Sequence, residues 1–352
     1  MKKVLIHCST NYGTSNFGDV LFAYLILQRL TEKGFQAAFY DLSPYVSNYL
    51  YHVCELPEYH FPVESADGVI YFAGGYFGEP RGYRLDKKII HYLRFMPVGN
   101  KAVRLNKKLA VIGIGAGNHL SFPTRLAVRR ICQKSYGITT RDKESTAFLQ
   151  SIGVTHQIET CSDIAQTIDF QKLRCSDEFY FNDCKKYVFL HTNFKTDIAY
   201  FFAEGLKLFF HHHPNVTAIV GADSEADIQV AYEMVASVLG RDRTVSYSYS
   251  TPDNLCYVLR RCGLIITYKL HVGILSAALG CSVIAFPKHE KVRRYYRQIG
   301  EAGRYVDYEE ATVDDVSRLA EKYFEEPIEL APEIKALAQK NWDIVDSFLA
   351  DI

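Results

Sequence analysis

Short apolar runs alternate with segments of helical period along the whole first half of the chain. Between the first two runs, Val20, Ala23, Tyr24 and Leu27 follow the i, i+3, i+4, i+7 spacing that gives a helix one apolar face. Repeated strand-then-helix units are typical of a parallel sheet with helices on both faces. The strands predicted in this half are Val4–Cys8, Ala37–Asp41, Gly68–Phe72, Leu109–Gly113, Gly137–Thr140 and Gln157–Thr160.

The same alternation starts again after a polar stretch, Asp169 to Lys186, that we interpret as an inter-domain linker. A chain of 352 residues is long enough for two domains of about 150 to 200 residues each. We therefore predict an α/β protein with one Rossmann-like domain over 1–170, a second over 186–330, and a helix within 331–352 that packs back on the first domain. Two such domains facing a cleft form a glycosyltransferase-B-like fold. The strands predicted in the second half are Tyr187–His191, Val216–Val220, Leu264–Thr267 and Val283–Phe286.

Charge and cysteine content exclude several classes of protein. Lysine plus arginine and aspartate plus glutamate both total 40, so no global positive field favours nucleic acid as a partner. The nine cysteines form no C-x-x-C pair, which indicates reduced thiols rather than a disulfide framework. No apolar run approaches the roughly 20 residues of a membrane span. We expect a soluble, cytoplasmic protein.

The turn Tyr268–Gly273 follows an apolar run and leads into a helix predicted over Val272–Leu279. If this turn is extended, Lys269 and His271 project to the same side, since side chains alternate along an extended backbone. They would flank a helix N-terminus, whose N–H groups and dipole favour an anion. The turn therefore predicts a site for a small phosphate or carboxylate ligand, with His271 placed for proton transfer.

Glycine-rich segments follow three predicted strands of the first half, at the sheet edge where ligands bind in open α/β sheets. Asn16-Phe17-Gly18-Asp19 lies before the first helix, and Gly74-Gly75 and Gly113-Ile114-Gly115 follow later strands. Glycines there let the backbone approach a ligand, and Asp19 suits a helix N-terminus. Taken alone, the first segment is more simply a capped turn with Asp19 as the cap, and a tight turn explains Gly74-Gly75 as well as a ligand contact does.

Charged residues at other strand ends extend the candidate site. Arg141 lies between a strand and a helix, where it can grip phosphate or carboxylate bidentately, or pair with the acidic residues of its own helix. Asp163 ends the following strand, where it holds a cation or caps a turn. Lys291 follows a strand of the second half. Consecutive histidines, His211–His213, point about 100° apart on a helix, so we expect no metal site there.

The order of these motifs resembles the polysaccharide pyruvyl transferase family from about Val4 to Gly300. The motifs that carry the resemblance are Asn16-Phe17-Gly18-Asp19, Gly74-Gly75, Gly113-Ile114-Gly115, Arg141-Asp142-Lys143-Glu144-Ser145, Ser162-Asp163-Ile164, Lys269-Leu270-His271 and Glu290-Lys291-Val292. The resemblance implies a glycosyltransferase-B-like fold and transfer of a pyruvyl group from phosphoenolpyruvate to a sugar, with formation of a cyclic ketal and release of phosphate. The family usually has Arg-Leu-His where this chain has Lys269, and lysine supplies charge without the planar fork of arginine.

The resemblance implies that His271 and Arg141 handle the donor. Phosphoenolpyruvate carries a phosphate and a carboxylate, so its site needs several cations. The donor-binding residues expected in the second domain are Lys269, His271 and Lys291. Those expected in the first domain, facing the second, are Arg141 and Gly115. The acceptor-binding residues expected on the first domain are Asn16, Gly18, Asp19, Gly74, Gly75 and Asp163. We expect His271, Arg141 and Asp19 to be catalytic, with Asp19 or Asp163 assisting the acceptor hydroxyl.

These expectations define one leading hypothesis and two rivals. The leading hypothesis is a pyruvyltransferase of surface-polysaccharide assembly that needs no cofactor or metal. Its acceptor would be a lipid-linked or nucleotide-linked sugar precursor. The protein would act at the inner face of the cytoplasmic membrane, with peripheral membrane association. Loops Tyr45–Pro62 and Phe77–Asn106 would shape the acceptor side. The runner-up is a nucleotide-sugar glycosyltransferase, for which Glu225 and Asp227 are candidate nucleotide contacts. A non-catalytic sugar-binding protein is the third hypothesis.

Overall fold

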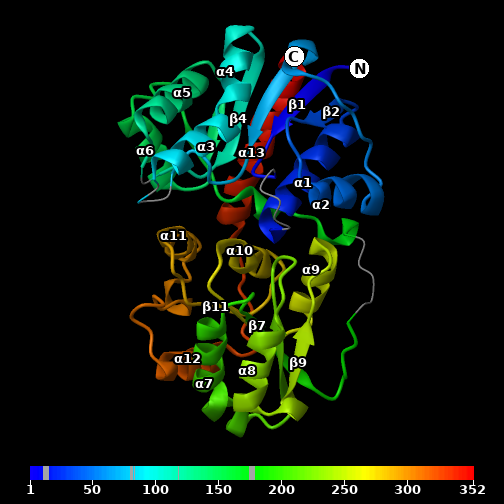
Figure 1. Ribbon diagram of the computed structural model, residues 1–352, viewed down its shortest axis with the longest axis vertical. Coiled ribbons are helices and arrows are strands. Elements are labelled where there is room, and N and C mark those ends of the chain that lie inside the picture. Colours follow the sequence, from blue (N-terminus) through cyan, green and yellow to red (C-terminus); the bar gives the residue numbers. More distant parts are fainter. Residues whose placement is uncertain (11–15, 80–81, 83, 118, 174–178) are drawn as a thin grey trace. The chain divides into compact units, whose positions relative to one another are not determined.

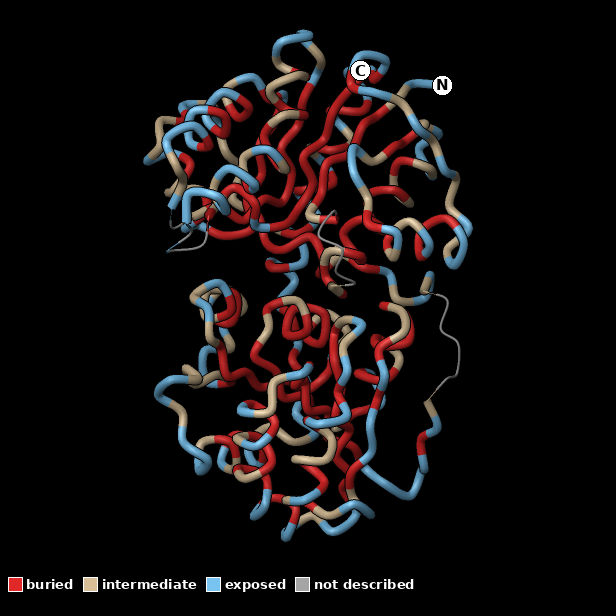
Figure 2. The backbone as a smooth tube through the Cα atoms, in the orientation of Figure 1, coloured by how far each residue is buried: buried red, intermediate tan, exposed pale blue. Residues whose placement is uncertain are grey.

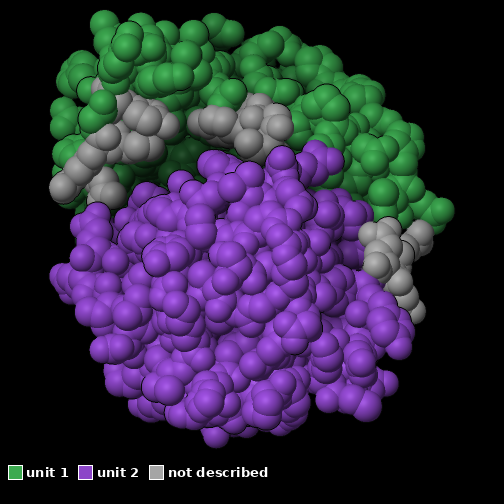
Figure 3. Space-filling view, turned by 60° about the horizontal axis from the view of Figure 1, so that its bottom comes forward, with its two compact units in different colours: residues 1–14, 19–167, 332–352 green, residues 15–18, 168–331 purple. Residues whose placement is uncertain are grey.

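The computed structural model describes residues 1–10, 16–79, 82, 84–117, 119–173 and 179–352 (Figure 1). The chain divides into two compact units, which Figure 3 colours separately. Unit 1 contains residues 1–14, 19–167 and 332–352, and unit 2 contains residues 15–18 and 168–331. Part of the predicted linker, with Cys175, lies outside the described residues.

Unit 1 is built on a six-stranded parallel sheet in the order β2-β1-β3-β4-β5-β6. Its strands are β1 (Lys3–His7), β2 (Gln36–Phe39), β3 (Gly68–Phe72), β4 (Lys108–Ile114), β5 (Ile138–Thr140) and β6 (Glu159–Thr160). Its helices are α1 (Phe17–Glu32), α2 (Pro44–Asn48), α3 (Leu85–Phe95), α4 (Pro97–Arg104), α5 (Phe122–Gln133), α6 (Lys143–Ser151) and α13 (Pro332–Asp351). All five residues of β3 are buried, because helices cover both faces of a parallel sheet (Figure 2).

The last helix, α13, belongs to unit 1 although unit 2 separates it from the rest in sequence. It packs against β4 and β5 and against the 3-10 turn Ile164–Thr167. Asn341 accepts a hydrogen bond from Thr139 Oγ1 at 2.6 Å, and the Trp342 indole donates to Thr167 Oγ1 at 2.8 Å. These buried contacts fix the C-terminal helix beneath the strand ends that carry the candidate site.

Unit 2 is a five-stranded parallel sheet in the order β11-β10-β7-β8-β9. Its strands are β7 (Lys186–His191), β8 (Val216–Gly221), β9 (Thr244–Tyr247), β10 (Leu264–Thr267) and β11 (Val283–Ala285). Its helices are α7 (Thr196–His212), α8 (Gln229–Leu239), α9 (Pro252–Arg260), α10 (Leu270–Ala278), α11 (Glu290–Gln298) and α12 (Val313–Tyr323). Aliphatic and aromatic side chains of α7, α8 and α12 pack on the strands to form its core.

The predicted α/β class with two parallel-sheet domains is confirmed, and the differences are local. Strand β9 was not predicted, because its serine and threonine residues break the apolar run that marks the other strands. The sixth strand spans only Glu159–Thr160 rather than Gln157–Thr160. Residues 15–18 group with unit 2, although the prediction placed them within a first domain over 1–170.

Candidate functional site

In unit 1, the carboxyl ends of the central strands carry the glycine-rich and charged segments that the sequence singled out. The chain turns sharply after β3, where Ala73 has φ +50° and Gly74 has φ +82°. A positive φ costs energy for alanine and persists only where the surroundings impose it. A Cβ on Gly74 would lie 2.9 Å from the Tyr76 ring. The Gly74 carbonyl accepts a hydrogen bond from Gly115 N at 2.8 Å. Gly74 is therefore required by the turn itself.

Arg141 is the central side chain of this edge, and it is 9% exposed. A Cβ on Gly115 would lie 2.6 Å from its Nη2 atom, so Gly115 provides the space that the guanidinium occupies. Gly75 lies further away, since its Cβ would be 3.8 Å from the same nitrogen. The guanidinium lies between two carboxylates, with Asp142 Oδ2 3.7 Å from Nε and Asp163 Oδ2 3.8 Å from Nη1. Strands β3, β4, β5 and β6 thus converge on one arginine.

The two carboxylates beside Arg141 have different environments. Asp142 is the N-cap of α6 and accepts a hydrogen bond from Ser145 N at 2.7 Å. Asp163 is 3% exposed and accepts from Ala165 N at 3.1 Å. Burial raises the pKa of Asp163, and the nearby Arg141 charge offsets this only in part. Asp163 is therefore a carboxyl group that retains a proton more readily than a solvated aspartate.

Asp19 lies in the first turn of α1, on the helix that follows β1, and is half-buried. Burial raises the pKa of the Cys8 thiol at the end of β1, and the Asp19 charge raises it further. Cys8 is therefore a protonated core thiol, and the negative charge of Asp19 lies near it.

In unit 2, the turn after β10 differs from the predicted geometry. Lys269 is extended, with φ −108° and ψ 149°, but α10 already begins at Leu270. The assumption of an extended turn up to Val272 was wrong, because the helix starts two residues earlier than predicted. The two side chains have separate environments: Lys269 Nζ donates to Asp223 Oδ1 at 2.7 Å, whereas His271 lies against Gly18.

Asp223 and its neighbours form a buried polar cluster that sequence reasoning missed. Asp223 Oδ1 accepts from Lys269 Nζ and from Asn193 Nδ2, the latter at 3.0 Å, and it lies 3.3 Å from His191 Nε2. His191 Nδ1 in turn lies 3.0 Å from Thr267 Oγ1. Asn193 has φ +50°, an uncommon conformation that its two hydrogen bonds with Asp223 hold in place.

This cluster holds its charges in an unusual state. Burial raises the pKa of Asp223, but attraction and hydrogen bonding from His191 and Lys269 outweigh it, so the pKa lies well below its usual range. Burial lowers the pKa of His191 more than Asp223 raises it. Asp223 is therefore ionised, and its negative charge balances the positive charge of Lys269. The polar residues Asn193 and Asp223, which follow β7 and β8 in the sequence, could have indicated this cluster.

The Asn16-Phe17-Gly18 segment is grouped with this turn in unit 2. Phe17 N donates to the Asp223 carbonyl at 2.9 Å, and Gly18 N donates to Asn16 Oδ1 at 3.1 Å. A Cβ on Gly18 would lie 1.9 Å from His271 Nδ1 and 2.6 Å from His271 Cβ. Only glycine fits there, so the segment acts both as the capped turn considered above and as the surface on which His271 packs.

Lys291 lies in the first turn of α11 and is exposed. The neighbouring Lys288 pairs with Asp197 at 3.2 Å and lies 3.9 Å from the centre of the Tyr308 ring. Arg293 on the same helix pairs with Glu290 at 2.6 Å. Much of the basic charge of this segment is therefore balanced by acidic side chains of unit 2.

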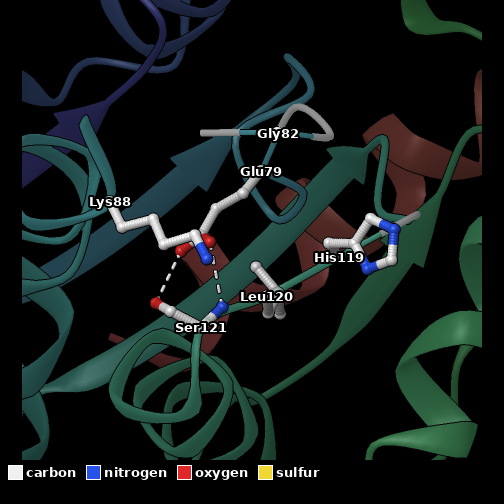
Figure 4. Close-up of a pocket in the computed structure, with 6 residues that line it drawn as sticks. All are labelled: Glu79, Gly82, Lys88, His119, Leu120 and Ser121. Carbon is white, nitrogen blue, oxygen red and sulfur yellow. Dashed lines mark hydrogen bonds between the residues drawn. The ribbon is translucent and has the colours of Figure 1, made fainter. Parts of the chain in front are cut away.

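A pocket of about 240 Å³ lies beside the ends of β3 and β4 in unit 1 (Figure 4). The residues that line it are Glu79, Gly82, Lys88, His119, Leu120 and Ser121. Glu79 is 2% exposed and accepts hydrogen bonds from Ser121 N and Oγ at 2.9 and 2.8 Å and from Thr124 Oγ1 at 2.8 Å. The pocket combines a hydrogen-bonded carboxylate with lysine, histidine and hydroxyl groups.

Neither a metal-binding cluster nor a membrane-spanning helix lies in the ranges that the structure describes. No group of three or more histidine, cysteine, aspartate or glutamate side chains within these ranges could hold a metal ion. His212 and His213 both contact Glu321, at 2.8 and 3.0 Å. In this part of the chain no helix has the length and apolar content that crossing a membrane requires.

The two parallel-sheet domains and their strand-end sites define a glycosyltransferase-B-like α/β protein. The UDP-bound MnaA of S. aureus has a TM-score of 0.65 at 10% identity, over 100% of this chain and 98% of that one. The UDP-N-acetylglucosamine 2-epimerase of Neisseria meningitidis has a TM-score of 0.64 at 10% identity, over 99% of this chain and 100% of that one. The MurG protein of Acinetobacter baumannii has a TM-score of 0.50 at 13% identity, over 99% of this chain and 100% of that one.

The sequence profile described as polysaccharide pyruvyl transferase matches residues 16–289, so the chain belongs to that family. A search of curated proteins gives no match. The match includes the strand-end motifs from Asn16 to His271 and ends before Lys291. The family is a transferase family whose description implies a sugar acceptor, as the motif order predicted.

Proposed function

We propose that this protein transfers the pyruvyl group of phosphoenolpyruvate to two hydroxyl groups of a sugar, giving a cyclic ketal and phosphate. The observation that carries the proposal is the family match over residues 16–289, which spans the Arg141 and His271 motifs. It is supported by the positions of those motifs at the carboxyl ends of parallel strands, where α/β folds bind ligands. No cofactor or metal is needed, because proton transfer and phosphate departure suffice.

The reaction has a simple proton balance. The methylene carbon of phosphoenolpyruvate gains a proton, and the first sugar hydroxyl attacks the central carbon. The bond between that carbon and the phosphate oxygen breaks, and the second hydroxyl attacks the same carbon to close the ring. Of the two protons that the hydroxyls lose, one replaces that given to the methylene carbon and the other leaves with phosphate. The protein therefore accepts two protons from the hydroxyls and gives back two, one to the methylene carbon and one to the departing phosphate.

The side chains of unit 1 supply one part of this chemistry in our proposal. Arg141 binds a donor anion, and its burial among carboxylates keeps its position defined before the ligand arrives. Asp163 is the favoured acceptor for a hydroxyl proton because its pKa is raised, which brings its basicity closer to neutral pH. Asp19 and the Gly75 backbone remain acceptor-side predictions.

In unit 2, we propose that His271 transfers the proton to or from the donor. Its ring is half-buried at the start of α10 and packs on Gly18. Lys269 has a smaller role in donor binding than the sequence suggested, because Asp223 balances its charge. Gly115 acts on the donor through Arg141, and Lys291 stays a donor-binding prediction.

The reaction is tested by incubating the purified protein with phosphoenolpyruvate and a panel of pyranosides. The expected result is phosphate release that depends on the sugar, with mass addition on the same sugar. A parallel incubation with nucleotide sugars tests the rival glycosyltransferase. Asp227 is already engaged, since it accepts a hydrogen bond from Gln229 N at 2.9 Å at the start of α8. Sugar transfer from a nucleotide donor, without any use of phosphoenolpyruvate, would overturn the proposal.

The role of Arg141 predicts a specific effect of Gly115→Ala. The added methyl group displaces the guanidinium, which is the flexible end of a side chain, so kcat is expected to fall at least about tenfold with little change in stability. Phosphate release and thermal unfolding measure the two effects. In an Arg141→Ala background the second substitution should add nothing. An equal further loss in that background would show that Gly115 does not act through Arg141.

We further propose that the acceptor is a lipid-linked or nucleotide-linked precursor of a surface polysaccharide, pyruvylated in the cytoplasm at the membrane face. The support is the family's action on polysaccharides. Comparing free sugars with lipid-linked and nucleotide-linked sugars in the same assay identifies the acceptor class.

A further inference from the structure

Helix α3 of unit 1 carries aliphatic side chains on its solvent face. Leu85 is 74% exposed, Ile89 50%, Ile90 47% and Leu93 62%. At about 100° per residue these four positions fall within an arc of about 140° along the helix, which also contains Asp86 in the first turn. The buried side of α3 is instead occupied by His91 and Phe95. A single exposed leucine is ordinary on a soluble protein, but four on one helix face form a patch that marks an interaction surface.

Helix α5 extends this surface. Phe122 is 64% exposed and Leu126 47%, one turn apart on the same helix. Helix α4 packs against both α3 and α5. Lys88 of α3 and Ser121, which precedes α5, line the same pocket and lie close together in Figure 4. The stripe of α3 and the first turns of α5 therefore belong to one part of unit 1, which we name the α3–α5 surface.

The charged residues on this surface are nearly all basic. Asp86 is the one acidic residue in the sequences of α3 and α5, and it pairs with Arg84 at 3.4 Å. Arg125 lies 5.6 Å from the centre of the Phe122 ring. The basic residues in or next to the two helices are Arg84, Lys87, Lys88, Arg94, Arg125, Arg129 and Arg130.

We propose that the α3–α5 surface binds the headgroup region of an anionic lipid bilayer. Aliphatic and aromatic side chains would enter the boundary with the acyl chains, while the flanking lysine and arginine side chains contact lipid phosphates. This combination of an apolar stripe with basic borders is complementary to anionic lipid. A second copy of the chain fits less well, since pairing this surface with itself brings like charges together. The proposal is independent of the reaction and holds for any sugar acceptor.

Flotation of the full-length protein with vesicles tests the proposal. Binding is expected to phosphatidylcholine vesicles that contain phosphatidylglycerol, and it should be weaker for phosphatidylcholine alone and at high salt. The variant Leu85→Ser/Ile89→Ser/Leu93→Ser should lose at least about tenfold in vesicle affinity, because it removes the inserted groups and leaves the basic residues in place. All three positions are exposed, so the fold is expected to survive.

A matched control removes exposed apolar side chains elsewhere. Tyr200, Leu208 and Val230 of unit 2 are 50%, 55% and 63% exposed, and their replacement by serine should leave vesicle binding unchanged. A second readout uses Leu93→Trp, whose added fluorescence should shift to shorter wavelength only with anionic vesicles. Absence of vesicle binding, equal binding by both triple variants, or a wild-type dimer that the α3 variant dissociates would overturn the proposal.

Discussion

Replacing His271 by glutamine is expected to slow sugar-dependent phosphate release from phosphoenolpyruvate by about 10²–10⁴-fold, the usual contribution of a general acid or base. Glutamine retains hydrogen-bonding groups and similar size but cannot exchange a proton near neutral pH. His271 lies at the start of α10, half-buried and packed on Gly18. Steady-state kinetics with each substrate varied should place the loss mainly in kcat.

Two further variants separate proton transfer from folding. His211→Gln makes the same substitution at an exposed histidine of α7 and should leave phosphate release unchanged. Gly18→Ala keeps the imidazole but places a methyl group where His271 Nδ1 lies, so it should also slow the reaction and destabilise unit 2 by about 1–3 kcal/mol. Combining it with His271→Ala should relieve only part of that destabilisation, because the imidazole is then gone but the Cβ atom of residue 271 still lies 2.6 Å from the added methyl group. Wild-type rates for His271→Gln would exclude the role proposed for this histidine.

The sequence was sufficient to predict the α/β class, because apolar runs mark the buried central strands such as β3, β4 and β7. It failed at β9, where Ser246 interrupts the run, and at residues 15–18, whose grouping depends on contacts distant in sequence. The predicted boundaries of the helices and strands were less accurate, because single local contacts set them. The start of α10 at Leu270 is set by the Lys269 backbone and its contact with Thr267, which periodicity does not report.

The candidate site was predicted only in part. Arg141 and Asp163 follow neighbouring strands in the sheet order, and parallel strands bring their ends together, so their proximity could be anticipated. Asp223 was missed because its importance depends on Lys269 and Asn193, which are 46 and 30 residues away. The roles of Gly18 and Gly115 also depend on which side chain occupies the space beside them. Glycine in a sequence indicates close approach but does not identify the neighbour.

Asp223→Ala is expected to destabilise unit 2 by about 2–3 kcal/mol, because it removes the buried partner of an ion pair whose other member, Lys269, is 30% exposed. The substitution leaves Lys269 without its carboxylate and removes the acceptor that holds Asn193 at φ +50°. Because two units can unfold separately, a single unfolding curve does not isolate the effect. Hydrogen exchange of the β7, β8 and β10 amides measures the stability of unit 2 directly.

The pH dependence has a defined sign. The pKa of Asp223 is lowered in the folded state, so its stabilising contribution is complete above the unfolded pKa of about 4 and is lost as pH falls below that value. Wild-type protection in unit 2 should therefore decrease more steeply below about pH 4 than that of Asp223→Ala. Asp183→Ala is the matched control: Asp183 pairs with Arg261 at 2.9 Å but its side chain is 89% exposed. Its loss should cost no more than about 1 kcal/mol.

A double variant distinguishes a charge effect from a packing effect at the same position. Asp223→Ala/Lys269→Met removes both charges, so it should recover part of the stability that Asp223→Ala alone loses. If the cost came only from the space left by the carboxylate, the second substitution would bring no recovery. Recovery of stability together with a modest further loss of activity would agree with a Lys269 whose charge serves mainly the folded state. In that case Arg141 and His271 handle the donor, and the lysine in place of the family's arginine is tolerated because Asp223 holds it.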